Sequence, residues 1–178
     1  LGFYTLLLSN LVGPQGKVFA FEPNPELLPS LERSLAPLAN VELIKVALSD
    51  REGEAGLFVP EDASMASLQN WTDGVVGEVH EVKCKIQVLD KMVEAGELPV
   101  PHFIKCDVEG AELSVFKGAI KTLDRTDAPV LLFELNTSAA AAFGSTTSEY
   151  FDLLRSLKKA EYSFFEVTAD GTREFASN

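Results

Sequence analysis

K-C-D-V-E-G-A-E at residues 105–112 ends an apolar run of the chain and opens a helix-like segment. F-E-P-N-P at residues 21–25 does the same earlier in the sequence. In both stretches a carboxylate lies where an expected strand passes into an expected helix. Open α/β sheets bind their ligands at the carboxyl ends of the strands. The two stretches therefore predict an α/β fold with an acidic site of the kind that binds a nucleotide cofactor.

The chain opens in a helix-like segment, L-G-F-Y-T-L-L-L at residues 1–8, and no strand or glycine-rich turn comes before it. A Rossmann-type unit begins with a strand, continues through a glycine-rich turn and then enters a helix. We therefore expect residues 1–178 to form one domain whose first strand and most of whose glycine-rich loop are missing from this sequence.

Composition narrows the class of protein. Hydrophobic residues make up 46% and charged residues 24% of the 178 positions, as in ordinary globular domains. The net charge of −12 disfavours nucleic acid and anionic membranes as partners, because both are bound through Lys and Arg. The two cysteines belong to no C-x-x-C motif, so we expect two reduced, buried thiols. No apolar run is long enough to span a bilayer and no signal-peptide pattern is present, so we expect a cytoplasmic protein.

Hydrophobic periodicity predicts alternating helices and strands. We expect helices at 1–12, 24–38, 90–95, 109–123 and 147–159. We expect strands at 17–22, 40–48, 56–60, 79–88, 102–107 and 129–135, and a hairpin of 162–167 with 172–175 around Asp170-Gly171. This order predicts a single α/β domain, mostly parallel, with an antiparallel pair of strands at the C-terminal end. Residues 61–77 are polar and small, and we expect them to form a loop over the site, with Trp71 as its anchor.

Five short motifs occur in order along nearly the whole chain: G-F-Y-T-L-L-L at 2–8, F-E-P-N-P at 21–25, V-A-L-S-D at 46–50, D-V-E-G-A-E at 107–112 and L-F-E-L at 132–135. Together they resemble the FkbM family of methyltransferases dependent on S-adenosylmethionine (SAM). The resemblance implies a Rossmann-like class I methyltransferase sheet with helices on both faces. It also implies SAM as cofactor and O-methylation of a hydroxyl on a sugar or small metabolite.

The resemblance, with the chemistry of the side chains, gives a set of expected cofactor contacts. A carboxylate can accept hydrogen bonds from both hydroxyls of a ribose, which is the role we expect for Glu22. An apolar wall suits the face of adenine, and Gly2 corresponds to the last glycine of the loop that cradles methionine. The expected cofactor-binding residues are Gly2, Glu22, Pro23, Asn24, Ala47, Leu48 and Asp107. Turn formation, helix capping and core packing remain alternative roles for several of them.

Three acids are expected near the reacting atoms: Asp107, Glu109 and Glu134. Methyl transfer requires an aligned acceptor and a group that takes its proton, and a carboxylate can do both. Asp107 has no basic residue directly after it, which favours a free carboxylate. For Glu112, in the first turn of the same helix, we expect only stabilisation by the helix dipole.

Three alternatives remain open from the sequence. A Mg²⁺ ion could be held by Asp107, Glu134 and Asn136, which offer the oxygen ligands that this ion accepts, although the family resemblance implies no metal. An oxidoreductase that uses NAD would also place an acid after its second strand, but G-x-G-x-x-G is absent. The chain could also be a non-catalytic domain with an incomplete site.

Overall fold

Parallel pairs of strands alternate with helices in the computed structural model, which describes residues 2–72 and 77–175. The helices are α1 (Phe3–Val12), α2 (Leu28–Leu35), α3 (Leu89–Glu94), α4 (Glu112–Lys117), α5 (Ile120–Leu123), α6 (Thr137–Ala142) and α7 (Ser148–Arg155), with a 3-10 turn η1 (Ala63–Met65). The strands are β1 (Val18–Phe21), β2 (Val41–Ile44), β3 (Ala47–Leu48), β4 (Gly53–Pro60), β5 (Val79–Gln87), β6 (Phe103–Cys106), β7 (Val130–Phe133), β8 (Phe165–Thr168) and β9 (Gly171–Glu174). The predicted α/β class is confirmed.

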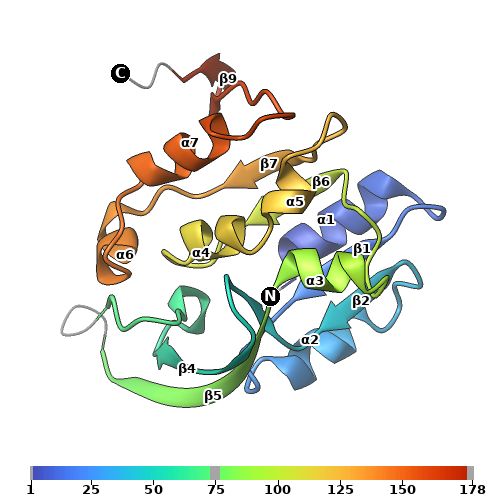
Figure 1. Ribbon diagram of the computed structural model, residues 1–178. Helices are drawn as coiled ribbons and strands as arrows, with labels where there is room; N and C mark the ends of the chain where they lie inside the picture. Colours follow the sequence, from blue (N-terminus) through green and yellow to red (C-terminus); the bar gives the residue numbers. More distant parts are fainter. Residues whose placement is uncertain (1, 73–76, 176–178) are drawn as a thin grey trace.

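Two parallel pairs form the centre of the fold, β1 with β2 and β6 with β7. The β4–β5 hairpin lies at one end of the molecule in Figure 1, and β3 extends it as a parallel neighbour of β5. The C-terminal hairpin of β8 and β9 lies at the opposite end (Figure 1) and is antiparallel, as the Asp170-Gly171 signal predicts. The acidic motifs follow β1 and β6 directly, at the carboxyl ends of the two parallel pairs. The topology therefore brings those motifs to one side of the domain.

Two expected elements are each divided in the structure. The strand expected at 40–48 is β2 and β3, which belong to different sheets. The helix expected at 109–123 is α4 and α5, separated at Gly118. A Cβ atom at Gly118 would lie 2.0 Å from the carbonyl oxygen of Ser49. Glycine is therefore required there by the close approach of the backbone, and glycine also weakens a helix interior.

The helix expected at 24–38 begins later, at Leu28, and Asn24 is not its N-cap. The Asn24 side chain instead accepts a hydrogen bond from the backbone N–H of Glu26 at 3.0 Å, which forms a local turn before the helix. α6 is absent from the sequence prediction because its run of alanines carries no amphipathic pattern. Asn136 caps this helix by accepting a hydrogen bond from the N–H of Ala139.

Aromatic side chains dominate the main core between the central strands and the helices α4 and α7. Phe116 and Tyr150 are fully buried, and their rings meet edge to face with centroids 6.1 Å apart. Phe133 of β7 packs edge to face against Phe116 at 5.3 Å. Pairs of this geometry add about 1 kcal/mol to the burial of their surface. This packing fixes α4 and α7 against the strands that carry the acidic motifs.

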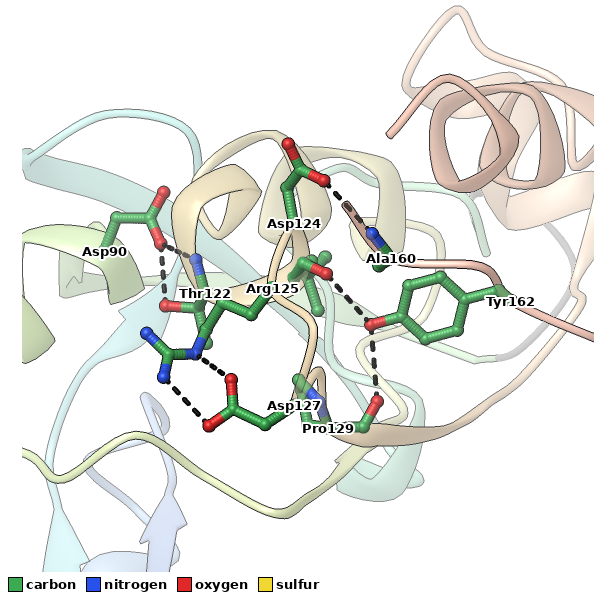
Figure 2. Close-up of polar contacts among 9 residues, drawn as sticks. Asp90, Thr122, Asp124, Arg125, Asp127, Pro129, Ala160 and Tyr162 are labelled. Carbon is green, nitrogen blue, oxygen red and sulfur yellow. Dashed lines mark hydrogen bonds and ion pairs between the residues drawn. The ribbon is translucent and has the colours of Figure 1, made fainter. Parts of the chain in front are cut away.

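A polar network stabilises the turn around α5, as Figure 2 shows. Asp90 accepts hydrogen bonds from the N–H groups of Lys121 and Thr122 and from the Thr122 hydroxyl. Asp124 accepts from the N–H groups of residues 158–160, so it ties the C-terminal segment to α5. The Tyr162 hydroxyl lies within hydrogen-bonding distance of the carbonyl oxygens of Leu123 and Pro129 (Figure 2). The carboxylates of Asp90 and Asp124 therefore each face several hydrogen-bond donors.

Cys84 and Cys106 are free and buried, as predicted. Within residues 2–72 and 77–175, no helix has the length and apolar character that a bilayer crossing requires.

Candidate functional site

A cleft of about 770 Å³ separates β1 from β6. Its walls follow both strands, from Lys17 and His102 at one end to Glu22 and Asp107 at the other. The two strands therefore present their carboxyl ends at the same end of the cleft. That is the place where parallel sheets bind ligands, and both motifs that begin the sequence argument meet there.

Three carboxylates gather at this end of the cleft. Cys106 of β6 pairs with Phe133 of β7, so the residues that follow them, Asp107 and Glu134, are neighbours. Glu109 belongs to the turn after β6. One oxygen from each of Asp107, Glu109 and Glu134 lies within 4.8 Å of the other two. The structure therefore brings together all three acids that the sequence places near the chemistry.

Crowding of these charges separates their pKa values. Interaction with Asp107, together with burial, raises the pKa of Glu134 to about 7. Burial opposes ionisation of Asp107, but hydrogen bonding to Lys105 and Glu134 brings its pKa below the ordinary value. Burial, followed by the charges of Asp107 and Glu112, raises the pKa of Glu109. At neutral pH the pair of Asp107 and Glu134 therefore holds a proton about half of the time, mainly on Glu134, because two crowded carboxylates do not both ionise readily.

Lys105, two residues before Asp107, is its basic partner, whereas the expectation from the sequence concerned only the residue that follows Asp107. Its Nζ contacts the Asp107 carboxylate and also lies 4.2 Å from the ring centroid of Tyr4 in α1. The two residues are two positions apart on a strand, so both side chains project from the same face. That spacing is the sequence signal that could have identified the pair.

The turn that carries Glu109 has an unusual backbone. Glu109 has φ +51°, and it is the one non-glycine residue of positive φ in the described ranges. Gly110 follows with φ +97°, and a Cβ there would lie 2.5 Å from the backbone of Ala139. The Ser67 hydroxyl donates a hydrogen bond to the carbonyl oxygen of Glu109 at 2.7 Å. A non-glycine residue in this region costs energy and is found where surrounding contacts enforce it.

Glu22 lies on the cleft wall directly after β1. Its Oε1 accepts a hydrogen bond from the N–H of Asn24 at 2.8 Å, and burial raises its pKa. This contact occupies one carboxylate oxygen. Two carboxylate oxygens offer about four lone-pair sites, so Glu22 keeps acceptor capacity for a hydroxyl ligand.

The other expected cofactor residues divide into two groups. Pro23, Ala47 and Leu48 line the cleft with Glu22. Gly2 and Asn24 lie outside the cleft lining, and Asn24 is 1% exposed. Gly2 adopts φ +72° at the start of α1, a conformation that favours glycine. Contacts of these residues with a cofactor stay predictions.

Part of the expected loop at 61–77 reaches the site. Ser64, Ser67 and Leu68 line the cleft, and Ser67 forms a bridge with Phe58 of β4. Residues 73–76 of this loop lie outside the described ranges. Sequence reasoning placed the segment over the site but missed the bond from Ser67 to Glu109.

The acids alone do not define a metal centre. Asn136, which the open Mg²⁺ alternative would use as a ligand, has its Oδ1 capping α6 and its Nδ2 bound to Glu109 at 3.3 Å. Lys105 contacts the Asp107 carboxylate and offsets part of the negative charge of the cluster. We therefore assign no ion to the cluster.

Comparison with known proteins identifies the family. The sequence profile described as the methyltransferase FkbM domain matches residues 2–164. The chain belongs to the FkbM methyltransferase family. A hexuronic acid methyltransferase, AglP, of Haloferax volcanii is 34% identical over 110 residues, which cover 61% of this chain and 44% of AglP. A 2-O-methyltransferase, NoeI, of Sinorhizobium fredii is 26% identical over 129 residues, covering 64% of this chain and 51% of NoeI.

The fold agrees with a solved structure of the family. The crystal structure of an FkbM methyltransferase from Methylobacillus flagellatus KT superimposes with a TM-score of 0.54 and 17% identity, over 88% of this chain and 36% of that one. At this identity the likeness concerns the fold alone. The FkbM resemblance drawn from five motifs is therefore confirmed, while the chain spans about half the length of the curated relatives that it matches.

Proposed function

We propose that this domain transfers a methyl group from SAM to a hydroxyl of a sugar or another small metabolite. The observation that carries the proposal is the placement of Glu22 and the pair of Asp107 and Glu134 at the ends of two strands on one cleft. Glu22 suits the ribose of the cofactor, while Pro23, Ala47 and Leu48 offer an apolar surface for adenine. Membership of the FkbM family supports the same chemistry.

The acids supply the proton chemistry of the proposal. SAM carries its methyl group on a positively charged sulfur, and methyl transfer to a hydroxyl releases one proton. Asp107 is the carboxylate that stays ionised, so it is the group placed to orient the hydroxyl and accept that proton. Glu134, with a pKa of about 7, is protonated about half of the time at neutral pH and can donate a hydrogen bond. Glu109 adds negative charge that favours the sulfonium.

The charge of the site favours a neutral acceptor group. Asp107, Glu109 and Glu134 would repel an acceptor that approached with a carboxylate, whereas a hydroxyl can donate a hydrogen bond to them. AglP is named for hexuronic acid and NoeI for 2-O-methylation. A sugar hydroxyl is therefore the acceptor class that we propose, with any sugar carboxylate directed away from the three acids.

The same cleft supports a proposal about the extent of the domain. In a parallel pair, every second residue of a strand bonds to its partner strand. The N–H groups of Val18 and Glu22 point toward β2 in this way, so the backbone groups of Phe19 and Phe21 point toward the cleft. The carbonyl oxygens of His102 and Cys106 accept hydrogen bonds from the β7 side. The backbone groups of Phe103 and Lys105 therefore point toward the cleft. No described residue pairs with these two edges.

The backbone N–H and C=O groups of these edges need partners, and a further strand between the two edges would supply them. We infer that residues 1–178 belong to a single methyltransferase domain whose first strand lies in this cleft and leads through the glycine-rich loop into α1. Such a unit, strand to α1 to β1, has the usual parallel crossover connection. The cofactor site then lies at the carboxyl end of the completed sheet.

Calorimetric titration with S-adenosylhomocysteine, with NAD as control, tests the cofactor. We expect S-adenosylhomocysteine to bind in preference to NAD, and Glu22→Ala to weaken it by about 2 kcal/mol. Binding of NAD alone would overturn the proposal. If neither binds, the titration is repeated on a chain extended upstream of Leu1, where a gain in affinity supports the missing strand. Transfer of a labelled methyl group to hexuronic acids and neutral hexoses then identifies the acceptor.

A further inference from the structure

Glu112 is a buried carboxylate that the proposed reaction does not use. It lies in the first turn of α4, as expected of an acid stabilised by the helix dipole, but it is only 1% exposed. Burial of a carboxylate is costly unless its oxygens are hydrogen-bonded. The role predicted from the sequence, stabilisation of the charge by the helix dipole, does not by itself explain this burial.

Each oxygen of Glu112 binds the turn that carries the acids. Oε1 accepts a hydrogen bond from the N–H of Val108 at 3.0 Å, and Oε2 accepts one from the N–H of Gly110 at 3.1 Å. These two N–H groups flank Glu109, the residue of positive φ. Glu112 therefore acts as a clamp on both sides of the strained position.

Tyr150 of α7 holds the clamp from the other side. Its hydroxyl lies 3.2 Å from Oε2 of Glu112 and 3.5 Å from the carbonyl oxygen of Gly110, and its side chain is fully buried. Burial, followed by the charge of Glu112, raises the pKa of Tyr150, so the phenol stays protonated and donates. The Tyr150 ring packs against Phe116 and Phe133, so the clamp is anchored to the aromatic core.

We propose that Glu112, held by Tyr150, is a positioning residue that sets the backbone of residues 108–110 and so brings Asp107 and Glu109 together with Glu134. Without the two accepted bonds, the turn loses what holds φ positive at Glu109, and the carboxylates that repel one another move apart. This inference deepens the proposed function, but its geometry is a property of the chain without any ligand.

Two substitutions at Glu112 test the clamp, and one of them keeps the negative charge of the side chain. Glu112→Asp keeps the negative charge and shortens the side chain, so it cannot span both N–H groups. Glu112→Gln removes the charge, which also contributes to the raised pKa of Glu134, and replaces one acceptor oxygen by an NH2 group that cannot accept from Val108 or Gly110. The readout is the titration of Glu134 followed by carboxyl NMR on the chain alone. We expect Glu112→Asp to lower the pKa of Glu134 from about 7 toward its ordinary value of 4.5, because Asp107 no longer faces it.

Asp90→Asn is the matched control, because Asp90 is also buried and accepts backbone hydrogen bonds at a helix start. It is expected to lower the melting temperature and leave the titration of Glu134 unchanged. If Glu134 still titrates at about 7 in the Glu112→Asp variant, the proposal is overturned, whatever the titration of Glu134 in Glu112→Gln. Failure of the chain to bind S-adenosylhomocysteine does not affect this result, since no ligand is present.

Tyr150→Phe keeps the experiment decisive if the Glu112 variants do not fold. The substitution removes the hydroxyl and leaves the ring packing in place. We expect faster hydrogen exchange at the amide of Gly110 than in the unaltered chain, and unchanged exchange in β4 and β5. Equal protection of Gly110 in both proteins would contradict the anchoring role of Tyr150.

Discussion

Carboxylates around α5 face donors, whereas those at the ends of β6 and β7 face one another. Asp124 accepts three backbone hydrogen bonds, from residues 158–160, and these lower its pKa, the bond from Lys159 most. Figure 2 shows the bond from Ala160. Glu134 meets Asp107, and its pKa rises to about 7. The first arrangement stabilises the fold and leaves no acid available for chemistry. The second costs stability and creates a group that can exchange a proton near neutral pH, which is typical of functional sites.

The largest effect on stability is expected from a carboxylate that faces donors around α5. Asp90→Ala leaves the N–H groups of Lys121 and Thr122 and the Thr122 hydroxyl without their acceptor. We expect the free energy of unfolding to fall by about 3 kcal/mol, as measured by denaturant titration. The folded fraction should bind S-adenosylhomocysteine with unaltered affinity, because Asp90 lies outside the lining of the main cleft. A loss of affinity in folded protein would contradict the division into two regions.

Asp107→Asn should lower activity and leave stability nearly unchanged, the opposite of Asp90→Ala. The substitution removes the ionised member of the pair, so we expect methyl transfer to fall on the order of 100-fold. The melting temperature should change little, because relief of the repulsion among the three acids offsets the lost contact with Lys105. The variant is assayed by transfer of labelled methyl beside Asp127→Asn, a carboxylate paired with Arg125 near α5. Loss of stability without loss of turnover in Asp107→Asn would reverse the comparison.

Glu134→Gln tests the cost of crowding through pH. Between about 4.5 and about 7 the folded protein keeps a proton on Glu134 that the unfolded chain releases, so stability falls as pH rises through this window. The glutamine variant lacks this loss. We expect its melting temperature to exceed that of the unaltered protein at pH 8, with the gap closing toward pH 4.

Glu161→Gln, a surface substitution in the C-terminal segment, controls for the removal of one negative charge. It should show no rise over the same window. If both variants gain equally at pH 8, the effect belongs to the net charge of −12 and not to the contact of Glu134 with Asp107.

The sequence predicted the end of each strand better than the contacts made there. Apolar runs ending in an acid located Glu22, Asp107 and Glu134, because parallel strands place their last residues at one edge. The burial of Glu112 was not predictable, since it depends on Tyr150, which is 38 residues away in sequence. The break at Gly118 depends in the same way on the distant backbone of Ser49. Local pattern therefore determined the placement of the acids, and long-range packing determined which of them are held and which are crowded.

Ser67→Ala is expected to have the smallest effect and to sharpen the comparison within the site itself. The Ser67 hydroxyl donates to the carbonyl oxygen of Glu109, so its loss should cost about 1 kcal/mol. Because Glu112 still binds Val108 and Gly110, the turn should keep its conformation, and Glu134 should still titrate near 7. Ser64→Ala, whose hydroxyl binds Asp62 instead, is the control. A shift of the Glu134 titration in Ser67→Ala would mean that the loop over the cleft, and not the core beneath it, sets the spacing of the acids.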